Sequence, residues 1–169
     1  MLIALAGLPG SGKTTLAEAL QRLTGSPVLN KDTARQALLP GRTQYSDADN
    51  DAVVESLLQQ AEDLLLAGTK AVILDGRTFS KRRQVERLRR FPLPLLIVEC
   101  RCSEQTALRR IDQDVEHPAP DRSADLYRRL RDSADPIDAD LVVDTDALSA
   151  DQAARLVERH MSDVAARPL

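Results

Sequence analysis

Hydrophobic residues along the chain fall into short continuous runs, separated by longer segments in which apolar positions recur every three or four residues. Runs this short that are apolar throughout are typical of parallel strands buried on both faces, and the periodic segments are typical of amphipathic helices. The alternation of the two predicts an α/β domain with one parallel sheet and right-handed crossovers. The predicted strands cover residues 2–6, 27–29, 71–74, 94–99 and 140–143.

The clearest helical pattern covers residues 49–67, where valines, leucines and alanines share one face. Ser46 and Asp49 form a capping-box pattern at its start, and Gly68 is a typical helix stop. A second capping pattern, at Ser149, begins the last predicted helix. These signals predict where two of the helices begin and where one of them ends.

The composition fits a single domain over residues 1–169, because no Gly- or Ser-rich linker divides the chain. Aromatic residues make up 2% and the net charge is −3. So few rings argue against a base-stacking platform, and the acidic balance argues against binding to a long duplex. Two cysteines are too few for a disulfide framework, and neither a membrane-spanning stretch nor a signal peptide is evident, so we expect a cytoplasmic protein.

The segment directly after the first predicted strand reads GLPGSGKT and matches the full phosphate-binding pattern G-x-x-x-x-G-K-[ST]. Glycines let the backbone turn its N–H groups toward a phosphate, and the helix that follows adds the positive end of its dipole. We expect Lys13 to reach the outer phosphates and Thr14 to hold Mg²⁺. The alternative is a glycine turn with a helix cap. The predicted nucleotide-binding residues are Gly7, Leu8, Pro9, Gly10, Ser11, Gly12, Lys13, Thr14 and Thr15.

A second candidate group follows the predicted strand 27–29, at the end of a strand where doubly wound sheets place ligands. Asp32 can accept the proton of an attacking hydroxyl there, and Arg35, one helical turn later, can hold an anionic part of the acceptor. The alternative interpretation makes Asp32 a helix cap and Arg35 its solvated partner. A guanine site is improbable, because the N-K-x-D pattern would need an aspartate where Thr33 stands.

The third predicted strand runs into Asp75, Gly76 and Arg77. An aspartate at the tip of a buried strand suits a Walker-B-like role near Mg²⁺, and it can equally orient the acceptor. A turn-forming Asp-Gly pair is the alternative. Arg77 is a candidate for contact with the acceptor. The basic segment 80–90 can attract phosphate-bearing substrates, but we interpret it as a solvated helix face.

The acidic, proline-broken segment 112–123 predicts a mobile lid at about residues 110–125. In phosphoryl transfer, positive groups around the moving phosphoryl carry much of the catalysis. Arg109 and Arg110 lead into the predicted lid and Arg122 lies within it. We expect at least one of them to stabilise the transition state, with Arg110 and Arg122 as the candidates.

Together these motifs resemble those of the small P-loop kinases grouped with the kinase domain of polynucleotide 5′-hydroxyl kinases. The resemblance runs through GLPGSGKTT, NKDTARQAL, VILDGRTF with the following KRR, the arginine pair before the lid, and DLYRRL after it. It implies a P-loop NTPase three-layer sandwich, with a five-stranded parallel sheet between helices and a short mobile lid. It also implies that Asp32 is the general base, that Arg35 contacts the acceptor near its reacting hydroxyl, and that Asp75 lies on the acceptor side. Arg110 matches the first lid arginine, whereas the second falls on Asp114.

The sequence therefore predicts an ATP- and Mg²⁺-dependent kinase that moves the γ-phosphoryl group to a hydroxyl. The first acceptor to test is the 5′-hydroxyl of a short nucleic acid or nucleotide, and the alternative is a small-molecule alcohol such as an antibiotic or sugar. A regulatory ATPase or nucleotide-dependent switch without an acceptor is the competing class. The predicted roles are catalytic for Lys13, Asp32, Arg110 and Arg122, acceptor-binding for Asp32, Arg35, Asp75 and Arg77, and metal-binding for Thr14 and Asp75.

Overall fold

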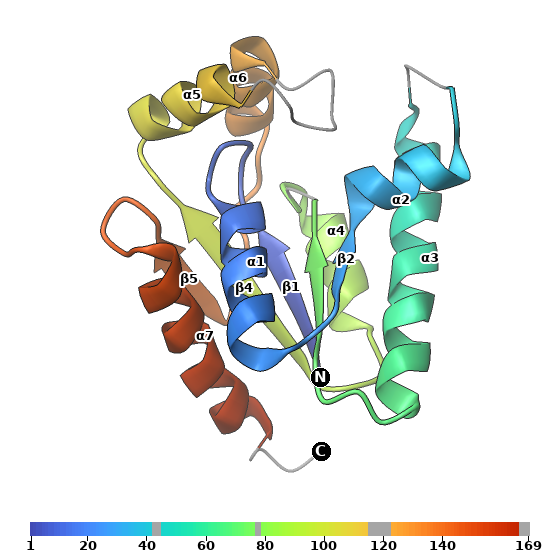
Figure 1. Ribbon diagram of the computed structural model, residues 1–169. Helices are drawn as coiled ribbons and strands as arrows, with labels where there is room; N and C mark the ends of the chain where they lie inside the picture. Colours follow the sequence, from blue (N-terminus) through green and yellow to red (C-terminus); the bar gives the residue numbers. More distant parts are fainter. Residues whose placement is uncertain (42–44, 77–78, 115–122, 166–169) are drawn as a thin grey trace.

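The computed structural model describes residues 1–41, 45–76, 79–114 and 123–165. At its centre lies a five-stranded parallel sheet in the order β2-β3-β1-β4-β5 (Figure 1). This architecture confirms the predicted α/β sandwich, and every predicted strand is present within one or two residues of its expected bounds. The strands are β1 (Leu2–Ala6), β2 (Val28–Asn30), β3 (Val72–Asp75), β4 (Leu95–Arg101) and β5 (Leu141–Asp144).

The central strand β1 is buried along its whole length, as its continuous apolar sequence predicts. Its residue Ile3 lies between Ile73 of β3 and Leu96 of β4 in the register of the sheet. The expectation of burial on both faces is wrong for the edge strand β5, where Val142 is 44% exposed. Because β5 is covered on one face by α7 and is open on the other, its buried and exposed positions alternate.

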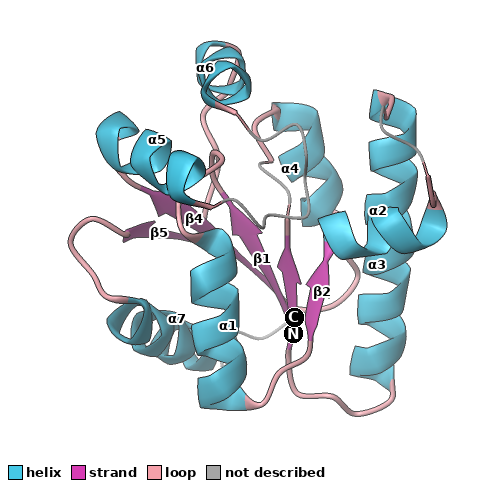
Figure 2. Cartoon of the chain, turned by 45° about the horizontal axis from the view of Figure 1, so that its top comes forward, coloured by secondary structure: helices cyan, strands magenta, loops and turns pink. Residues whose placement is uncertain are grey.

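Helices cover both faces of the sheet (Figure 2). On one face α1 and α7 pack together around residues such as Leu5, Leu20 and Val157, and on the other α3 and α4 pack around Ala4, Leu57 and Leu88 in a second apolar cluster. The helices are α1 (Lys13–Thr24), α2 (Lys31–Leu38), α3 (Asp47–Leu66), α4 (Arg82–Arg89), α5 (Glu104–Gln113), α6 (Ala124–Asp132) and α7 (Ala150–Ala165).

The predicted helix starts are confirmed by their capping bonds. The Ser46 hydroxyl accepts from the Asp49 N–H at 3.1 Å, and the Asp49 carboxylate accepts from the Ser46 N–H at 2.9 Å. At α7 the Ser149 N–H donates to the Gln152 side chain at 2.9 Å. These reciprocal bonds satisfy N–H groups that have no partner within the helix.

Helices α5 and α6 lie beyond the carboxyl ends of the strands, at the top of Figure 1. They flank the segment for which a lid over about residues 110–125 is predicted, and residues 115–122 of that segment lie outside the described residues. Among the described helices, none combines the length and apolar composition that a bilayer crossing requires. The carboxyl ends of the strands, below α5 and α6 in Figure 1, lead into the phosphate-binding loop and α2, which carry many of the predicted site residues that the structure describes.

Candidate active site

The loop between β1 and α1 has the sharply turned backbone, with positive φ values, that its glycines predict. Gly7, Gly10 and Gly12 have φ values of 132°, 75° and 88°, in the region that side chains with a Cβ rarely adopt. A Cβ on Gly7 would lie 2.3 Å from the Cys100 carbonyl oxygen, and one on Gly10 would lie 2.5 Å from that of Ala107. The loop is therefore packed tightly between β4 and α5, and its shape depends on glycine at these positions.

Lys13 lies in the first turn of α1, and its side chain turns back over the loop. Its Nζ donates to the carbonyl oxygens of Gly7 and Leu8, each at 2.9 Å. The first turn of α1 contains no acidic residue, so nothing on that turn neutralises the positive end of the helix dipole. Ser11 adds a buried hydroxyl that has no hydrogen-bond partner among the described residues. This arrangement is suited to an anion held by backbone amides and an ammonium group.

Asp75, at the carboxyl end of β3, joins the loop to the start of α2. Its Oδ2 accepts from the Thr14 hydroxyl at 2.9 Å and from the Asn30 side-chain amide at 2.8 Å. The carboxylate is buried, and Oδ1 has no partner among the described residues. The side chain is directed at two other elements and not at its own turn, which disfavours the interpretation as a turn-forming Asp-Gly pair.

Thr14 and Asp75 fit a magnesium site. A buried carboxylate oxygen without a partner is costly, because burial removes its hydration, unless a cation or donor arrives. A hydroxyl and a carboxylate are the hard oxygen ligands that Mg²⁺ prefers, with phosphate oxygens completing its shell. The predicted metal-binding pair therefore lies together, next to the loop expected to hold phosphates.

Asn30 is a residue of the candidate site that the sequence analysis did not single out. It ends β2 and caps α2, since its Oδ1 accepts from the N–H groups of Asp32 and Thr33 at 2.9 and 3.0 Å. Its amide nitrogen binds Asp75 at the same time. The helix cap is therefore Asn30 and not Asp32, so the alternative role given to Asp32 is wrong. The signal was present, because asparagine is a preferred capping residue at the strand–helix junction.

Asp32 and Arg35 form a buried ion pair on α2. They are 8% and 6% exposed, and the Arg35 Nη2 lies 3.1 Å from the Asp32 Oδ1. The guanidinium also lies over the Tyr45 ring, 4.3 Å from its centroid, and donates to the Asn50 side chain at 3.5 Å. Arg35 is thus not a solvated partner. Its Nε is buried without a partner among the described residues, so the group keeps an unused donor.

Arg110 lies against the phosphate-binding loop, at the end of α5. Its Nη1 donates to the Gly10 carbonyl oxygen at 3.2 Å and to the Thr145 hydroxyl at 2.9 Å, while Nη2 donates to the Thr145 carbonyl oxygen at 3.0 Å. The Thr145 hydroxyl in turn donates to the Ser11 carbonyl oxygen at 3.1 Å. The guanidinium therefore joins α5 and the β5–α7 connection to the loop, and its catalytic role stays a prediction. Arg109 is exposed.

Two predicted residues, Arg77 and Arg122, lie outside the described residues. Thr15 is exposed on the first turn of α1.

Two cysteines lie near the loop. Burial raises the pKa of the Cys100 thiol to about 12. Burial also raises the pKa of Cys102, whose Sγ lies 3.7 Å from the Gly10 carbonyl oxygen. Both thiols are therefore protonated at neutral pH and are weak nucleophiles.

Comparison with known proteins agrees with this arrangement. A sequence model described as an AAA domain matches residues 2–137. A search of curated protein sequences found no match. Solved structures of similar shape share 16–24% sequence identity with this chain, and at that level the likeness shows the fold alone.

Three solved structures illustrate that likeness. A sugar kinase from Janibacter sp. HTCC2649 is 20% identical with a TM-score of 0.73, over 97% of this chain and 95% of its own. The APS kinase of Mycobacterium tuberculosis, solved with AMPPNP and APS, is 20% identical with a TM-score of 0.71, over 95% and 96%. A gluconokinase from Sinorhizobium meliloti 1021 is 20% identical with a TM-score of 0.70, over 96% and 92%.

Proposed function

The chain belongs to the AAA domain family that matches residues 2–137, and from that membership together with the site geometry we propose that it is an ATP- and Mg²⁺-dependent kinase for a small-molecule alcohol. The γ-phosphoryl group of ATP moves to a hydroxyl oxygen of the acceptor. A new P–O bond forms to that oxygen, the bond to the ADP leaving group breaks, and the hydroxyl proton passes to a protein carboxylate.

The continuous line of hydrogen bonds from the phosphate-binding loop to α2 carries this proposal. Thr14 binds Asp75, Asp75 binds Asn30, and Asn30 binds the N–H of Asp32. The backbone of Asp32, in the first turn of α2, is thereby joined by three consecutive hydrogen bonds to Thr14, the residue that follows Lys13. We infer that this link holds the helix of the proposed base beside the proposed phosphate site, because transfer requires that the protein orient both reacting groups.

On the nucleotide side the protein supplies charge and shape. The loop amides and Lys13 bind the β and γ phosphates, and the free end of the α1 dipole adds to the positive potential. Thr14 and Asp75 hold Mg²⁺, which neutralises charge on the phosphate oxygens when it is bound with the nucleotide. These groups stabilise charge that develops during transfer, and they need no covalent step of their own.

On the acceptor side Asp32 accepts the proton and Arg35 holds the acceptor. The Arg35 Nη2 lies 3.1 Å from the Asp32 Oδ1, so the two side chains are held next to each other on α2. Arg35 is itself held by Asn50 and stacked over Tyr45, so its guanidinium has a defined orientation. A preorganised base and donor reduce the reorganisation that transfer requires.

The acceptor is proposed to be a small molecule because of the pairing on α4. Polynucleotide binding would call for a row of available cations beside the site. Arg87 of α4 is paired instead with Glu55, and Arg89 with Asp140 at 2.9 Å, so these two cations are not available, and Arg82 alone does not make a row. The solved kinases of similar fold that are named for sugar, gluconate and APS give the same indication.

The test is transfer of labelled γ-phosphate from ATP by wild type and Asp32→Asn, against a panel of small alcohols, nucleosides and 5′-hydroxyl oligonucleotides. We expect wild type to label at least one small alcohol. Asp32→Asn should reduce the rate by roughly 10²- to 10⁴-fold, the usual contribution of general-base catalysis, while ATP binding is kept. Asp163→Asn, at an exposed position on α7, serves as the matched control and should keep the full rate.

Three other outcomes would contradict parts of the proposal. Full transfer by Asp32→Asn would remove this residue from its proposed role. Label on oligonucleotides alone would replace the small alcohol by a nucleic-acid acceptor. Label that appears only as free phosphate with every acceptor would favour a regulatory ATPase.

A further inference from the structure

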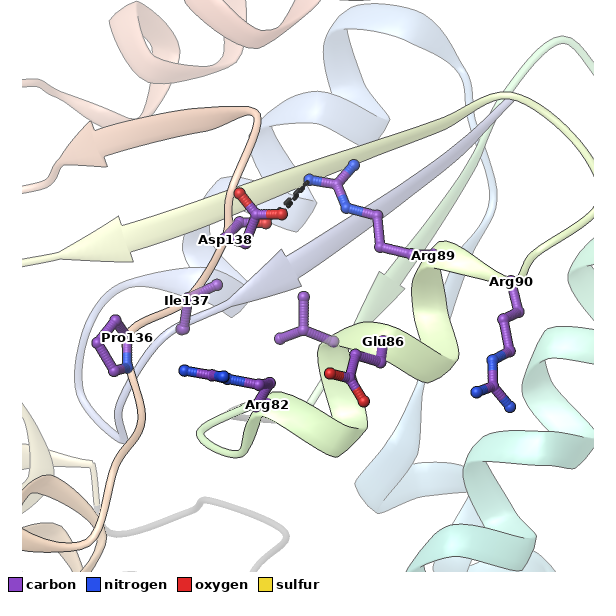
Figure 3. A pocket seen from close by; sticks show the side chains of 8 residues that line it. Arg82, Glu86, Arg89, Arg90, Pro136, Ile137 and Asp138 are labelled. Atoms are coloured by element: carbon purple, nitrogen blue, oxygen red, sulfur yellow. Dashed lines mark hydrogen bonds and ion pairs between the residues drawn. The ribbon is translucent and has the colours of Figure 1, made fainter.

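A cavity in the described part of the chain lies apart from the phosphate-binding loop. It is about 620 Å³ in volume, and it opens between α4 and the extended segment that leads from α6 to β5 (Figure 3). Val85 and Leu88 of α4 and Ile137 of the extended segment belong to the apolar cluster on the α4 face of the sheet, opposite α1 and α7. Its volume falls in the range of small-molecule sites, roughly 300–1,000 Å³.

The cavity is preformed, because its two walls are joined at both ends. At the start of α4, the Asp135 N–H donates to the Ser80 carbonyl oxygen at 2.8 Å, and the Arg82 N–H donates to the Asp135 carboxylate at 2.9 Å. At the end of α4, Arg89 donates to both carboxylate oxygens of Asp140 at 2.9 Å. Two such ties hold α4 and the extended segment at a set separation, so a ligand would find the cavity already open.

The walls combine an apolar floor with one available cation. Val85 is buried, and Ile137 and Pro136 complete the apolar part. Figure 3 shows the Arg82 side chain extending toward Pro136, while Arg90 points away from Pro136 and Ile137. The Arg82 guanidinium has no partner among the described residues, in contrast to Arg89, whose charge Asp138 and Asp140 balance.

Glu86 limits what the cavity accepts. It lines the cavity, and its carboxylate has no partner among the described residues. A ligand with several negative charges, such as a nucleotide tail, would therefore meet repulsion here as well as attraction. A single negative charge paired with Arg82, on a body that covers the apolar floor, matches the walls best.

We propose that this cavity is a second ligand site, which binds a small organic monoanion with its charged group at Arg82 and its apolar body against Val85, Pro136 and Ile137. Apolar contact supplies affinity in such a site, and the charged pair supplies orientation. The cavity shares no lining residue with the phosphate-binding loop, so we expect its ligand to bind without displacing ATP. The proposal stands whether or not the protein is a kinase.

The experiment is a fluorescence titration of the full chain with anilinonaphthalenesulfonate, a monoanionic aromatic probe that brightens in apolar surroundings. We expect saturable binding at one site, weakened roughly tenfold in Arg82→Ala, as expected for the loss of one charge-assisted bond. Glu86→Gln should bind at least as tightly as wild type, because it removes a like charge. Arg155→Ala, an exposed arginine on α7 on the other face of the sheet, is the matched control and should bind like wild type.

Competition completes the test. Saturating MgATP and a short oligonucleotide should both leave the probe in place. Displacement by MgATP would locate the probe at the phosphate-binding loop, and displacement by the oligonucleotide would make the face a nucleic-acid surface; each result overturns the proposal. Two further results would also overturn the proposal. One is an Arg82→Ala protein that is folded by circular dichroism and binds the probe as tightly as wild type does. The other is the absence of saturable probe binding in wild type.

Discussion

At the scale of single residues, the site depends on backbone positions that only glycine can occupy and on side chains with two partners each. Gly7 is an example of the former, since its φ of 132° and the carbonyl of Cys100 leave no room for a Cβ. Asn30 is an example of the latter, since it caps α2 and orients Asp75. The glycine is recognisable from a local motif, whereas the role of the asparagine becomes visible only with its partner from β3.

Gly7→Ala should destabilise the protein by roughly 3 kcal/mol or more, from backbone strain together with overpacking against β4. Gly25→Ala is the matched control, because Gly25 also has a positive φ of 71° but a Cβ there would have nothing within 4 Å. Its cost should be about 1–2 kcal/mol, from the left-handed backbone alone. Urea unfolding measures both, and equal losses would contradict the packing argument.

Asn30→Asp should lower the phosphotransfer rate while the helix stays capped. Aspartate is as good a cap as asparagine, but it removes the donor to Asp75 and places a second carboxylate beside it. Repulsion between the two carboxylates favours protonation of one of them, so activity should recover as the pH rises. The rate–pH profile of this variant should therefore have its acid limb at higher pH than that of wild type. Asn30→Ser, which caps without a charge, should show no such displacement.

At the scale of elements, helix starts are set by local chemistry that a sequence displays directly. The capping box at Ser46 and Asp49 and the pattern at Ser149 are both confirmed by their hydrogen bonds. Strands were equally predictable in position, but the expected burial of β5 on both faces was wrong, because a continuous apolar run does not reveal whether a strand lies at the edge of a sheet. That distinction depends on the strand order, with β5 beside β4 alone.

Ser46→Ala should destabilise the protein by about 1 kcal/mol, since it removes the acceptor for the Asp49 N–H at the start of α3. For a domain of this size the corresponding fall in Tm is roughly 2–4 °C. Ser56→Ala, at an exposed position in the middle of the same helix, should leave Tm unchanged or raise it slightly, because alanine is the better helix former. Thermal unfolding followed by circular dichroism distinguishes the two, and a Ser46→Ala protein as stable as wild type would exclude a stabilising cap.

At the scale of the whole molecule, two helical layers hold a sheet whose carboxyl edge gathers groups from distant parts of the chain. The phosphate-binding loop follows β1, Asn30 ends β2 and Asp75 ends β3. Parallel strands place these ends at one edge, so residues 45 and 61 positions apart become hydrogen-bond partners. Ligand binding at this edge should therefore stabilise the entire domain.

MgATP at about 100 times its Kd should stabilise the folded protein by about 2.7 kcal/mol, because only the folded loop binds it. The expected rise in Tm is roughly 5–10 °C for a chain of this length. Lys13→Ala should lose most of this rise, since it removes an ammonium group that contacts the loop at two carbonyl oxygens. A wild-type protein whose Tm does not change with MgATP would contradict nucleotide binding at this loop.

The amino-acid sequence by itself determined the strands, the capping patterns at Ser46 and Ser149 and the phosphate-binding loop, because each depends on residues that are neighbours along the chain. It also marked Asp32, Arg35 and Asp75 as candidates, without showing whether their side chains are buried or exposed. Only the tertiary structure decided that Asn30 joins Asp75 to α2, that Arg110 contacts the loop, and that a cavity lies between α4 and the segment before β5. These contacts join residues far apart in the chain, and their existence depends on how the strands are ordered and how the helices pack against them.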